Sequence, residues 1–199
     1  MTSKIIILLG RRGCGKTEYA KHILKSLKRY IILDPIDEYK DGLKIYNFDE
    51  LSNLIMKYRF NDELRLSYTP SFNEDTQICF QGLCKVIYAM GNITFVVEEI
   101  GTFMTATSCA KQFLSLVRLS RHKDINLISI TQRATDIPRL LRSQATEIIS
   151  FQQIEPRDLK YLKEFLNTDT IEKIRHFKNY EYLSYQSDGK ITYHKPLNL

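Results

Sequence analysis

The sequence predicts an α/β fold whose central sheet is mostly parallel and flanked by helices, with a β-hairpin at the C-terminal end. Short β-branched runs alternate with stretches of helical spacing along most of the chain. Most of these runs are continuously apolar, which is typical of strands that helices cover on both faces. With 199 residues, of which 43% are hydrophobic and 26% charged, the chain is expected to form a single domain over residues 1–199.

Six strands are expected before the hairpin. They cover residues 4–9, 30–33, 64–69, 93–97, 125–131 and 147–151. Apolar residues recur at helical spacing between them, over residues 16–29, 75–90 and 109–121. Parallel strands need long crossovers, usually helical, so this alternation favours a parallel sheet.

The C-terminal stretch 180–194 has a different pattern, with two alternating runs on either side of a turn at Asp188-Gly189. Such a turn between alternating runs predicts a β-hairpin. Its tyrosines could stack on nucleic-acid bases or on a partner, or the hairpin could pack one face on the domain. They are Tyr180, Tyr182, Tyr185 and Tyr193.

The chain carries a net charge of +6 and has a pI near 9.0. Residues 1–100 hold 14 basic and 13 acidic side chains, whereas residues 101–199 hold 15 and 10. The excess therefore lies in the second half. A polyanionic partner fits this charge but is not required by it, because a solvated basic face has the same signature.

Membrane insertion and secretion are not indicated by the sequence. Its longest apolar runs fall far short of the ~20 residues that span a bilayer, and no leader-like segment opens the chain. The four cysteines lack paired spacing or nearby histidines, which argues against a zinc site or a disulfide framework. We therefore expect a soluble cytoplasmic protein without a transmembrane segment.

Residues 10–17, "GRRGCGKT", fit the pattern G-x-x-x-x-G-K-[ST] and lie between an expected strand and an expected helix. In such a P-loop, backbone N–H groups and the helix N-terminus surround phosphate oxygens, Lys16 reaches the β and γ phosphates, and the hydroxyl of Thr17 holds Mg²⁺. A guanine-reading N-K-x-D sequence is absent, so ATP is the expected nucleotide. The predicted nucleotide-binding residues are Gly10, Arg11, Arg12, Gly13, Cys14, Gly15, Lys16 and Thr17.

An acidic pair follows the apolar strand in "NITFVVEEIG". Glu98 is expected to bind Mg²⁺ together with Thr17, and Glu99 to activate the water that attacks the γ phosphate. The alternative is an exposed strand end. Two more expected strands lie between the phosphate loop and the acidic pair, and Gln132 ends the expected strand after the pair. This layout suits P-loop ATPases with an extra strand between the two motifs.

The segment "LSRHKDINLISITQRATDIPRLLRSQATEIISF", residues 119–151, resembles part of the HerA/FtsK superfamily of DNA-pumping ATPases. "IILDPIDEY", residues 31–39, is similar to the D-P-x-x-E-Y element of that superfamily. The resemblance implies a RecA-like P-loop NTPase fold with a motif-bearing core over about 4–151, followed by C-terminal helices and the hairpin over 152–199. The small size most resembles genome-packaging ATPases of viruses with internal membranes and related phage assembly ATPases.

One residue departs from the superfamily pattern, because Glu98 stands where Asp is usual. The resemblance assigns no catalytic role to Asp34 or Glu38. It implies that Gln132 is a polar sensor that positions water, although a strand-capping glutamine would look the same.

The resemblance also implies an arginine finger that a neighbouring subunit extends toward bound ATP. Arg121 is the candidate, and Arg118 and Arg142 are its competitors. Segment 118–142 carries six basic and two acidic residues, so some of them could contact DNA phosphates instead.

The function implied is Mg²⁺-dependent ATP hydrolysis coupled to movement of double-stranded DNA, packaging a viral genome into a capsid. Expected partners are DNA, further copies of the chain in a homo-oligomeric ring, and a capsid or membrane-vertex protein, in the host cytoplasm or with the virion. Two alternatives stay open. One is an assembly or secretion ATPase of the same superfamily that acts on a coat or membrane protein, and the other is a small-molecule phosphotransferase with a P-loop.

Overall fold

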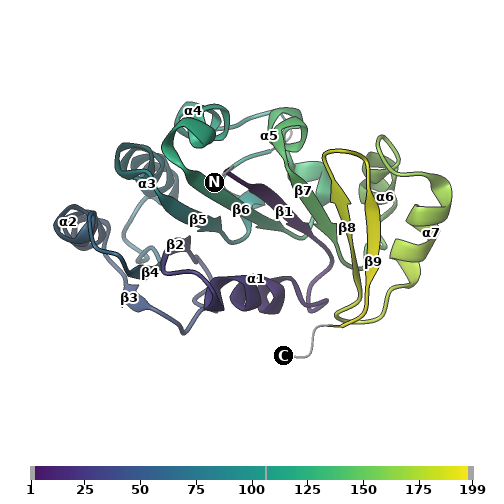
Figure 1. Cartoon of the computed structure of the whole chain (residues 1–199), viewed down its shortest axis with the longest axis horizontal. Helices are drawn as coiled ribbons and strands as arrows, with labels where there is room; N and C mark the ends of the chain where they lie inside the picture. Colours follow the sequence, from purple (N-terminus) through teal and green to yellow (C-terminus); the bar gives the residue numbers. More distant parts are fainter. Residues whose placement is uncertain (1–2, 106, 197–199) are drawn as a thin grey trace.

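The computed structural model describes residues 3–105 and 107–196, which build a nine-stranded sheet with the order β3-β4-β2-β5-β6-β1-β7-β8-β9 (Figure 1). The strands from β3 to β7 pair in parallel. Only the last two pairings, β7 with β8 and β8 with β9, are antiparallel among the described residues. The predicted mostly parallel α/β sheet is confirmed.

The strands are β1 (Ile5–Leu9), β2 (Arg29–Leu33), β3 (Leu43–Ile45), β4 (Leu64–Tyr68), β5 (Ile93–Val97), β6 (Ile125–Thr131), β7 (Glu147–Ser150), β8 (Tyr182–Gln186) and β9 (Ile191–His194). All six predicted strands are present, with ends that differ from the prediction by no more than one residue. The predicted hairpin is β8 and β9, and the turn between them contains Asp188 and Gly189.

The helices are α1 (Lys16–Lys25), α2 (Phe48–Tyr58), α3 (Thr76–Met90), α4 (Lys111–Leu119), α5 (Arg139–Gln144), α6 (Pro156–Leu162) and α7 (Thr168–His176). Short 3₁₀ segments are η1 (Ile100–Thr102), η2 (Ser120–Lys123) and η3 (Ala134–Asp136). The predicted helices correspond to α1, α3 and α4 with η2. Helix α1 ends before the expected residue 29, because the chain enters β2 there.

Sequence analysis missed the edge strand β3 and the helices α2 and α5. Strand β3 has three residues, too few to show a period. Helix α2 has recognisable signals, because the side chain of Asn47 accepts a hydrogen bond from the N–H of Glu50 as an N-cap, and Leu51 and Ile55 are buried one turn apart.

Alternate residues of the strands point into two hydrophobic layers. In β1, Ile7 belongs to a core cluster shared with α2 to α7, whereas Leu8 belongs to a second cluster shared with Ala20 and Leu24 of α1. Helix α1 accordingly lies on one side of the sheet and α3 and α4 on the other (Figure 1). Both faces are covered, which explains why the strands are apolar without alternation.

The parallel strands place their carboxyl ends at one edge of the sheet. Gly10 follows β1, Asp34 follows β2, Glu98 follows β5 and Gln132 follows β6. Ligands of open α/β sheets bind outside this edge. Residues that are far apart in sequence therefore meet in one place.

The central strand β5 should dominate stability. Phe95 is 0% exposed and packs in the larger core cluster, whereas Phe60 is 85% exposed. We expect Phe95→Ala to lower the free energy of unfolding by about 3–5 kcal/mol, because it leaves a cavity in a packed core. Phe60→Ala should change it little. Urea unfolding followed by circular dichroism measures both, and equal losses would contradict this account of the core.

Candidate active site

The loop of residues 10–17 joins β1 to α1, and α1 begins at Lys16 within the loop. Lys16 is buried, and its Nζ donates a hydrogen bond to the carbonyl oxygen of Arg11 at 3.1 Å. A lysine ammonium has three protons, and a single neutral carbonyl leaves most of its charge uncompensated. The buried cation at a helix N-terminus is suited to binding an anion.

Two glycines of the loop are required by close packing. A Cβ on Gly15, whose φ is 111°, would lie 2.6 Å from a ring carbon of Tyr180. A Cβ on Gly10 would lie 2.6 Å from the Sγ of Cys14 and 2.7 Å from the Cβ of Phe151. The backbone N–H of Tyr180 also donates to the carbonyl of Cys14 at 2.9 Å. The segment before β8 therefore supports the phosphate loop, a role that the sequence did not reveal.

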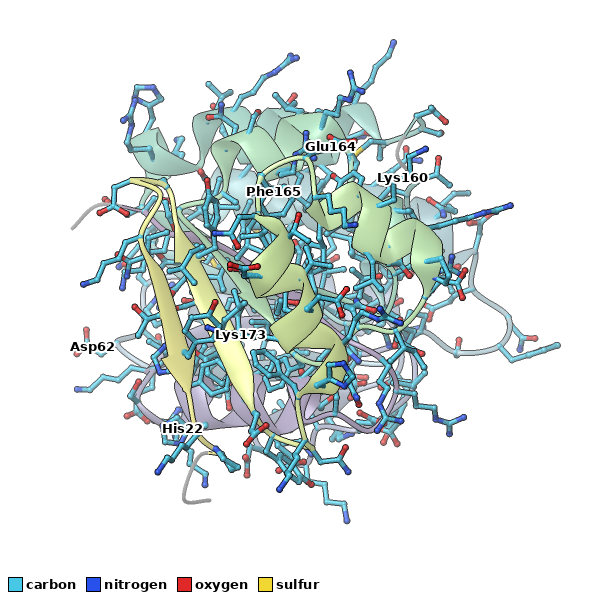
Figure 2. The ribbon with its side chains drawn as sticks, turned by 90° about the vertical axis from the view of Figure 1, so that its right-hand side faces the viewer. His22, Asp62, Lys160, Glu164, Phe165 and Lys173 are labelled. Atoms are coloured by element: carbon cyan, nitrogen blue, oxygen red, sulfur yellow. The ribbon has the colours of Figure 1, made fainter. Side chains whose placement is uncertain are left out.

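The other hairpin tyrosines pack on the body of the protein, and the hairpin itself lies beside α6 and α7 (Figure 2). Tyr182 is buried against Phe151. The ring of Tyr185 packs on Phe165, and the hydroxyl of Tyr193 lies 3.0 Å from that of Thr170. These contacts favour hairpin packing over base stacking for the three residues.

The acidic pair begins with Glu98, which is 1% exposed at the end of β5. The hydroxyl of Thr17 donates to its Oε1 at 3.3 Å, and the hydroxyl of Tyr39 donates to its Oε2 at 2.6 Å. The two predicted metal ligands, Thr17 and Glu98, are thus neighbours. A hydroxyl and a carboxylate are the oxygen donors that Mg²⁺ accepts, so the residues present fit this cation.

Burial raises the pKa of Glu98 to about 7. The hydrogen bond from Tyr39 opposes this shift, the carboxylates of Glu99 and Glu38 add to it, and the Lys16 charge lowers the pKa again. Desolvation therefore outweighs the favourable contacts. A divalent cation at this position would favour the charged carboxylate.

Glu99 has an unusual backbone conformation, with φ 49° and ψ 53°. This left-handed region costs a residue with a long side chain about 1–3 kcal/mol and is found where the surroundings hold it in place. The Nε2 of Gln132 donates to Oε1 of Glu99 at 2.6 Å. Gln132 is itself held by buried Gln153, whose Nε2 donates to its carbonyl at 3.1 Å. Gln153 carried no recognisable sequence signal.

A cavity of about 500 Å³ joins these elements. Its lining residues are Arg12, Gly13, Lys16, Thr17, Ile36, Glu38, Glu98, Glu99 and Gln132. Seven of the nine were predicted site residues, and the other two come from the "DPIDEY" stretch, to which no role in catalysis had been assigned. The volume is in the range of small-molecule and cofactor sites.

Two predicted loop residues contact other parts of the chain. The Arg11 guanidinium donates to the Oε1 of Gln152 and, at 3.3 Å, to the Oδ1 of Asn179. Cys14 is buried, and burial raises the pKa of its thiol. The Arg11 side chain thus links the loop to the C-terminal segment, and neither Arg11 nor Cys14 is among the residues that line the cavity.

The arginine-finger candidates lie in different surroundings. Arg121 is exposed in η2, before the amino end of β6, whereas Gln132 follows the carboxyl end of the same strand. Arg121 is therefore at the opposite edge of the sheet from its own cavity and could serve only that of another subunit. Arg118, at the end of α4, is also exposed.

Arg142 is held within its own chain. Its Nη1 donates to Oε2 of Glu164 at 2.7 Å, and its guanidinium lies over the rings of Tyr161 and Phe165 at 4.8 and 5.4 Å from their centroids. Figure 2 labels Glu164 and Phe165, which follow the end of α6. These contacts favour a structural role for Arg142.

No protein-family model matches the sequence, and no curated protein matches it. Solved structures do resemble it. The genome packaging NTPase B204 of Sulfolobus turreted icosahedral virus 2, in complex with ATP-gammaS, is similar at a TM-score of 0.79, with 24% identity over 98% of both chains. The chain has an α/β P-loop NTPase fold. The DNA-packaging ATPase B204 of Sulfolobus turreted icosahedral virus has a TM-score of 0.73 and 23% identity over 100% of both chains.

Another solved structure, with lower sequence identity, supports the same P-loop NTPase fold. VirB4 of Thermoanaerobacter pseudethanolicus has a TM-score of 0.74 and 13% identity, and the match covers 98% of this chain and 89% of that one. The fold implied by the sequence resemblance is thus confirmed. Among the described residues, no helix is both long and apolar enough to cross a membrane.

The surroundings of Arg142 and Arg121 predict different effects of truncation. Arg142→Ala removes an ion pair and two cation–π contacts and should lower Tm by about 2 °C in a protein of this size. Arg121→Ala removes an exposed side chain and should shift Tm by less than about 1 °C. Differential scanning fluorimetry compares them. A larger loss in Arg121→Ala would contradict the structural role given to Arg142.

Proposed function

We propose that the protein is a Mg²⁺-dependent ATPase that uses ATP hydrolysis to move double-stranded DNA, packaging a viral genome into a capsid. The observation that carries the proposal is the cavity in which Lys16, Thr17, Glu98, Glu99 and Gln132 come together. Its support is the likeness of nearly the whole chain to genome-packaging NTPases solved with AMP, AMPPCP and ATP-gammaS.

Each residue has a chemical role that follows from its position. The loop N–H groups and Lys16 bind the β and γ phosphates, and Thr17 and Glu98 hold Mg²⁺, which neutralises phosphate charge when bound. Glu99 orients the attacking water and accepts its proton. The amide of Gln132 holds the Glu99 carboxylate through the 2.6 Å hydrogen bond.

DNA contact is proposed for the basic surface near η2. Its exposed cations include Arg118 and Lys123. Contacts to the phosphate backbone are independent of base sequence, which a motor that moves along a whole genome requires.

Assembly into a homo-oligomeric ring is part of the proposal. Arg121 lies at the other edge of the sheet from its own chain's cavity, where Arg12 of the phosphate loop is the arginine among the lining residues. A neighbouring copy could supply the finger arginine. A capsid or membrane-vertex protein would then hold the ring at the virion, in the host cytoplasm.

The proposed function predicts Mg²⁺-dependent ATP turnover that rises on addition of linear double-stranded DNA. This stimulation should fall steeply with salt, because phosphate contacts release counterions. Glu99→Gln should bind ATP and lose turnover by a factor of about 10² to 10⁴, since the proton acceptor is gone. A phosphate-release assay measures the turnover of the wild type and of this variant.

Other outcomes favour the alternatives. Turnover that DNA does not change, but that a coat or membrane protein stimulates, would favour an assembly or secretion ATPase. Phosphate transfer to a small acceptor would favour a phosphotransferase.

If a neighbouring subunit supplies Arg121, two inactive variants should complement each other. Arg121→Ala should bind ATP and turn it over poorly, because an arginine in trans is worth about 10³ to 10⁵ in rate. Lys16→Ala cannot use ATP but still offers Arg121 to the next subunit. Mixing the two should restore part of the turnover, measured at fixed total protein.

The matched control for this experiment is Arg118→Ala mixed with Lys16→Ala. If Arg118→Ala, and not Arg121→Ala, is inactive alone and regains turnover when mixed with Lys16→Ala, Arg118 is the finger. Turnover per subunit that is independent of protein concentration, in a protein that stays monomeric with DNA, would overturn the ring.

A further inference from the structure

The turn after β2 brings one buried tyrosine to the acidic pair. Asp34 directly follows β2 and is fully buried. Its two carboxylate oxygens accept hydrogen bonds from the backbone N–H groups of Glu38 at 3.1 Å and Tyr39 at 2.9 Å. Lys44 lies 3.9 Å from the same carboxylate. Asp34 therefore closes the turn from inside and fixes the backbone at Tyr39.

Tyr39 is 1% exposed, and its hydroxyl has a polar partner in the Glu98 carboxylate. The O–H···O distance of 2.6 Å is in the range of hydrogen bonds to an ionised acceptor. Thr17 contacts the other carboxylate oxygen of Glu98, at 3.3 Å. The two oxygens thus have different partners: Oε2 faces the turn and Oε1 faces the phosphate loop.

The restraint matters because a glutamate has one more rotatable bond than an aspartate. A carboxylate at the end of the longer side chain can occupy several positions, and ordering it costs conformational entropy. A second contact point, on the oxygen that does not face the loop, removes this freedom before any cation arrives. Partners of this kind orient metal ligands in many metal sites.

We propose that Tyr39 is a positioning residue that holds Oε2 of Glu98, so that Glu98 presents only Oε1 to a divalent cation beside Thr17. The inference rests on the proposed function and adds to it a residue that touches neither nucleotide nor cation. Tyr39 acts through Glu98 and compensates for the extra length of glutamate at this position. It also gives the Asp34 turn a role in the site.

The test is the Mg²⁺ dependence of nucleotide binding in Tyr39→Phe. Phenylalanine fills the same space and removes only the hydroxyl. The affinity for a fluorescent ATP analogue is measured with EDTA and over a series of Mg²⁺ concentrations, together with the Mg²⁺ concentration that gives half-maximal turnover. We expect both Mg²⁺ midpoints to rise by about 10-fold or more, the usual effect of losing a partner of a metal ligand. Affinity in EDTA should stay within about twofold of the wild type, since Tyr39 holds no phosphate.

Tyr68→Phe is the matched control. Tyr68 is also fully buried, and its hydroxyl donates to a carboxylate, that of Glu74, at 3.0 Å. Neither Tyr39 nor Tyr68 lines the cavity. Tyr68→Phe should lose a comparable hydrogen bond and leave the Mg²⁺ midpoints unchanged. A shift of the same size in both variants would show a general effect of a buried Tyr→Phe change and overturn the proposal.

A double-mutant cycle gives a second measurement. Glu98→Asp shortens the side chain and separates the carboxylate from Tyr39, so Tyr39→Phe should have little further effect on the Mg²⁺ midpoint in that background. Additive effects, or a wild-type midpoint in Tyr39→Phe alone, would overturn the inference while leaving the ATPase intact. If wild-type nucleotide binding does not depend on Mg²⁺, the proposed function fails, and this inference fails with it.

Discussion

The parallel pairing of β2, β5, β6 and β1 is the constraint on which the candidate site depends. Leu33 pairs with Val97, Val97 with Ser129, and Leu9 with Thr131, so these strands end nearly level with one another. The turn after β2, the acidic pair, Gln132 and the phosphate loop then leave the sheet at the same edge. A one-residue shift in any pairing would move a side chain to the other face of the sheet. The hydrophobic layers on both faces hold the register in place.

The same register concentrates charge. Glu98 is buried, Glu99 follows it directly, and Glu38 lines the same cavity, with Lys16 and Arg12 opposite. Burial raises the pKa of Glu98, and the neighbouring carboxylates of Glu99 and Glu38 raise it further. The arrangement is electrostatically costly on its own and becomes favourable when a divalent cation and an anionic ligand bind together. Tyr39, Thr17 and Gln132 hold the carboxylates in position before that happens.

Local sequence predicted the parts of the site that depend on spacing within one segment. The phosphate loop is defined by glycines, Lys16 and Thr17 within eight residues, and the acidic pair by its place after an apolar run. Tyr39 could not be assigned in this way, because its partner Glu98 is 59 residues away. Gln153, after β7, donates a hydrogen bond to the carbonyl of Gln132, and Tyr180, before β8, donates one to the carbonyl of Cys14 in the phosphate loop. Both donors lie in the last quarter of the chain.

The fold shows the same contrast between features set by one segment and features that depend on another part of the chain. Six strands and the hairpin were predictable because each has its own apolar pattern, whereas β3 owes its existence to the neighbouring β4. Its three residues pair with Leu66, Ser67 and Tyr68 of β4, and their own pattern is too short to predict a strand. Arg142 is a similar case. The sequence leaves it as a competitor of Arg121 for the finger role, and only its tertiary contacts with Glu164 and Tyr161 indicate a structural role.

Strand β6 connects the two edges of the sheet that the proposed motor uses. It runs for seven residues from Ile125 to Thr131, or about 23 Å at 3.3 Å per residue. Gln132 at its carboxyl end contacts Glu99, and Arg121 in η2 lies just before its amino end. The strand is paired on both sides, with β1 and with β5, so a continuous hydrogen-bonded strand joins the two edges. In the proposed ring, one edge holds the chain's own nucleotide, and the other offers Arg121 to the cavity of the neighbouring copy.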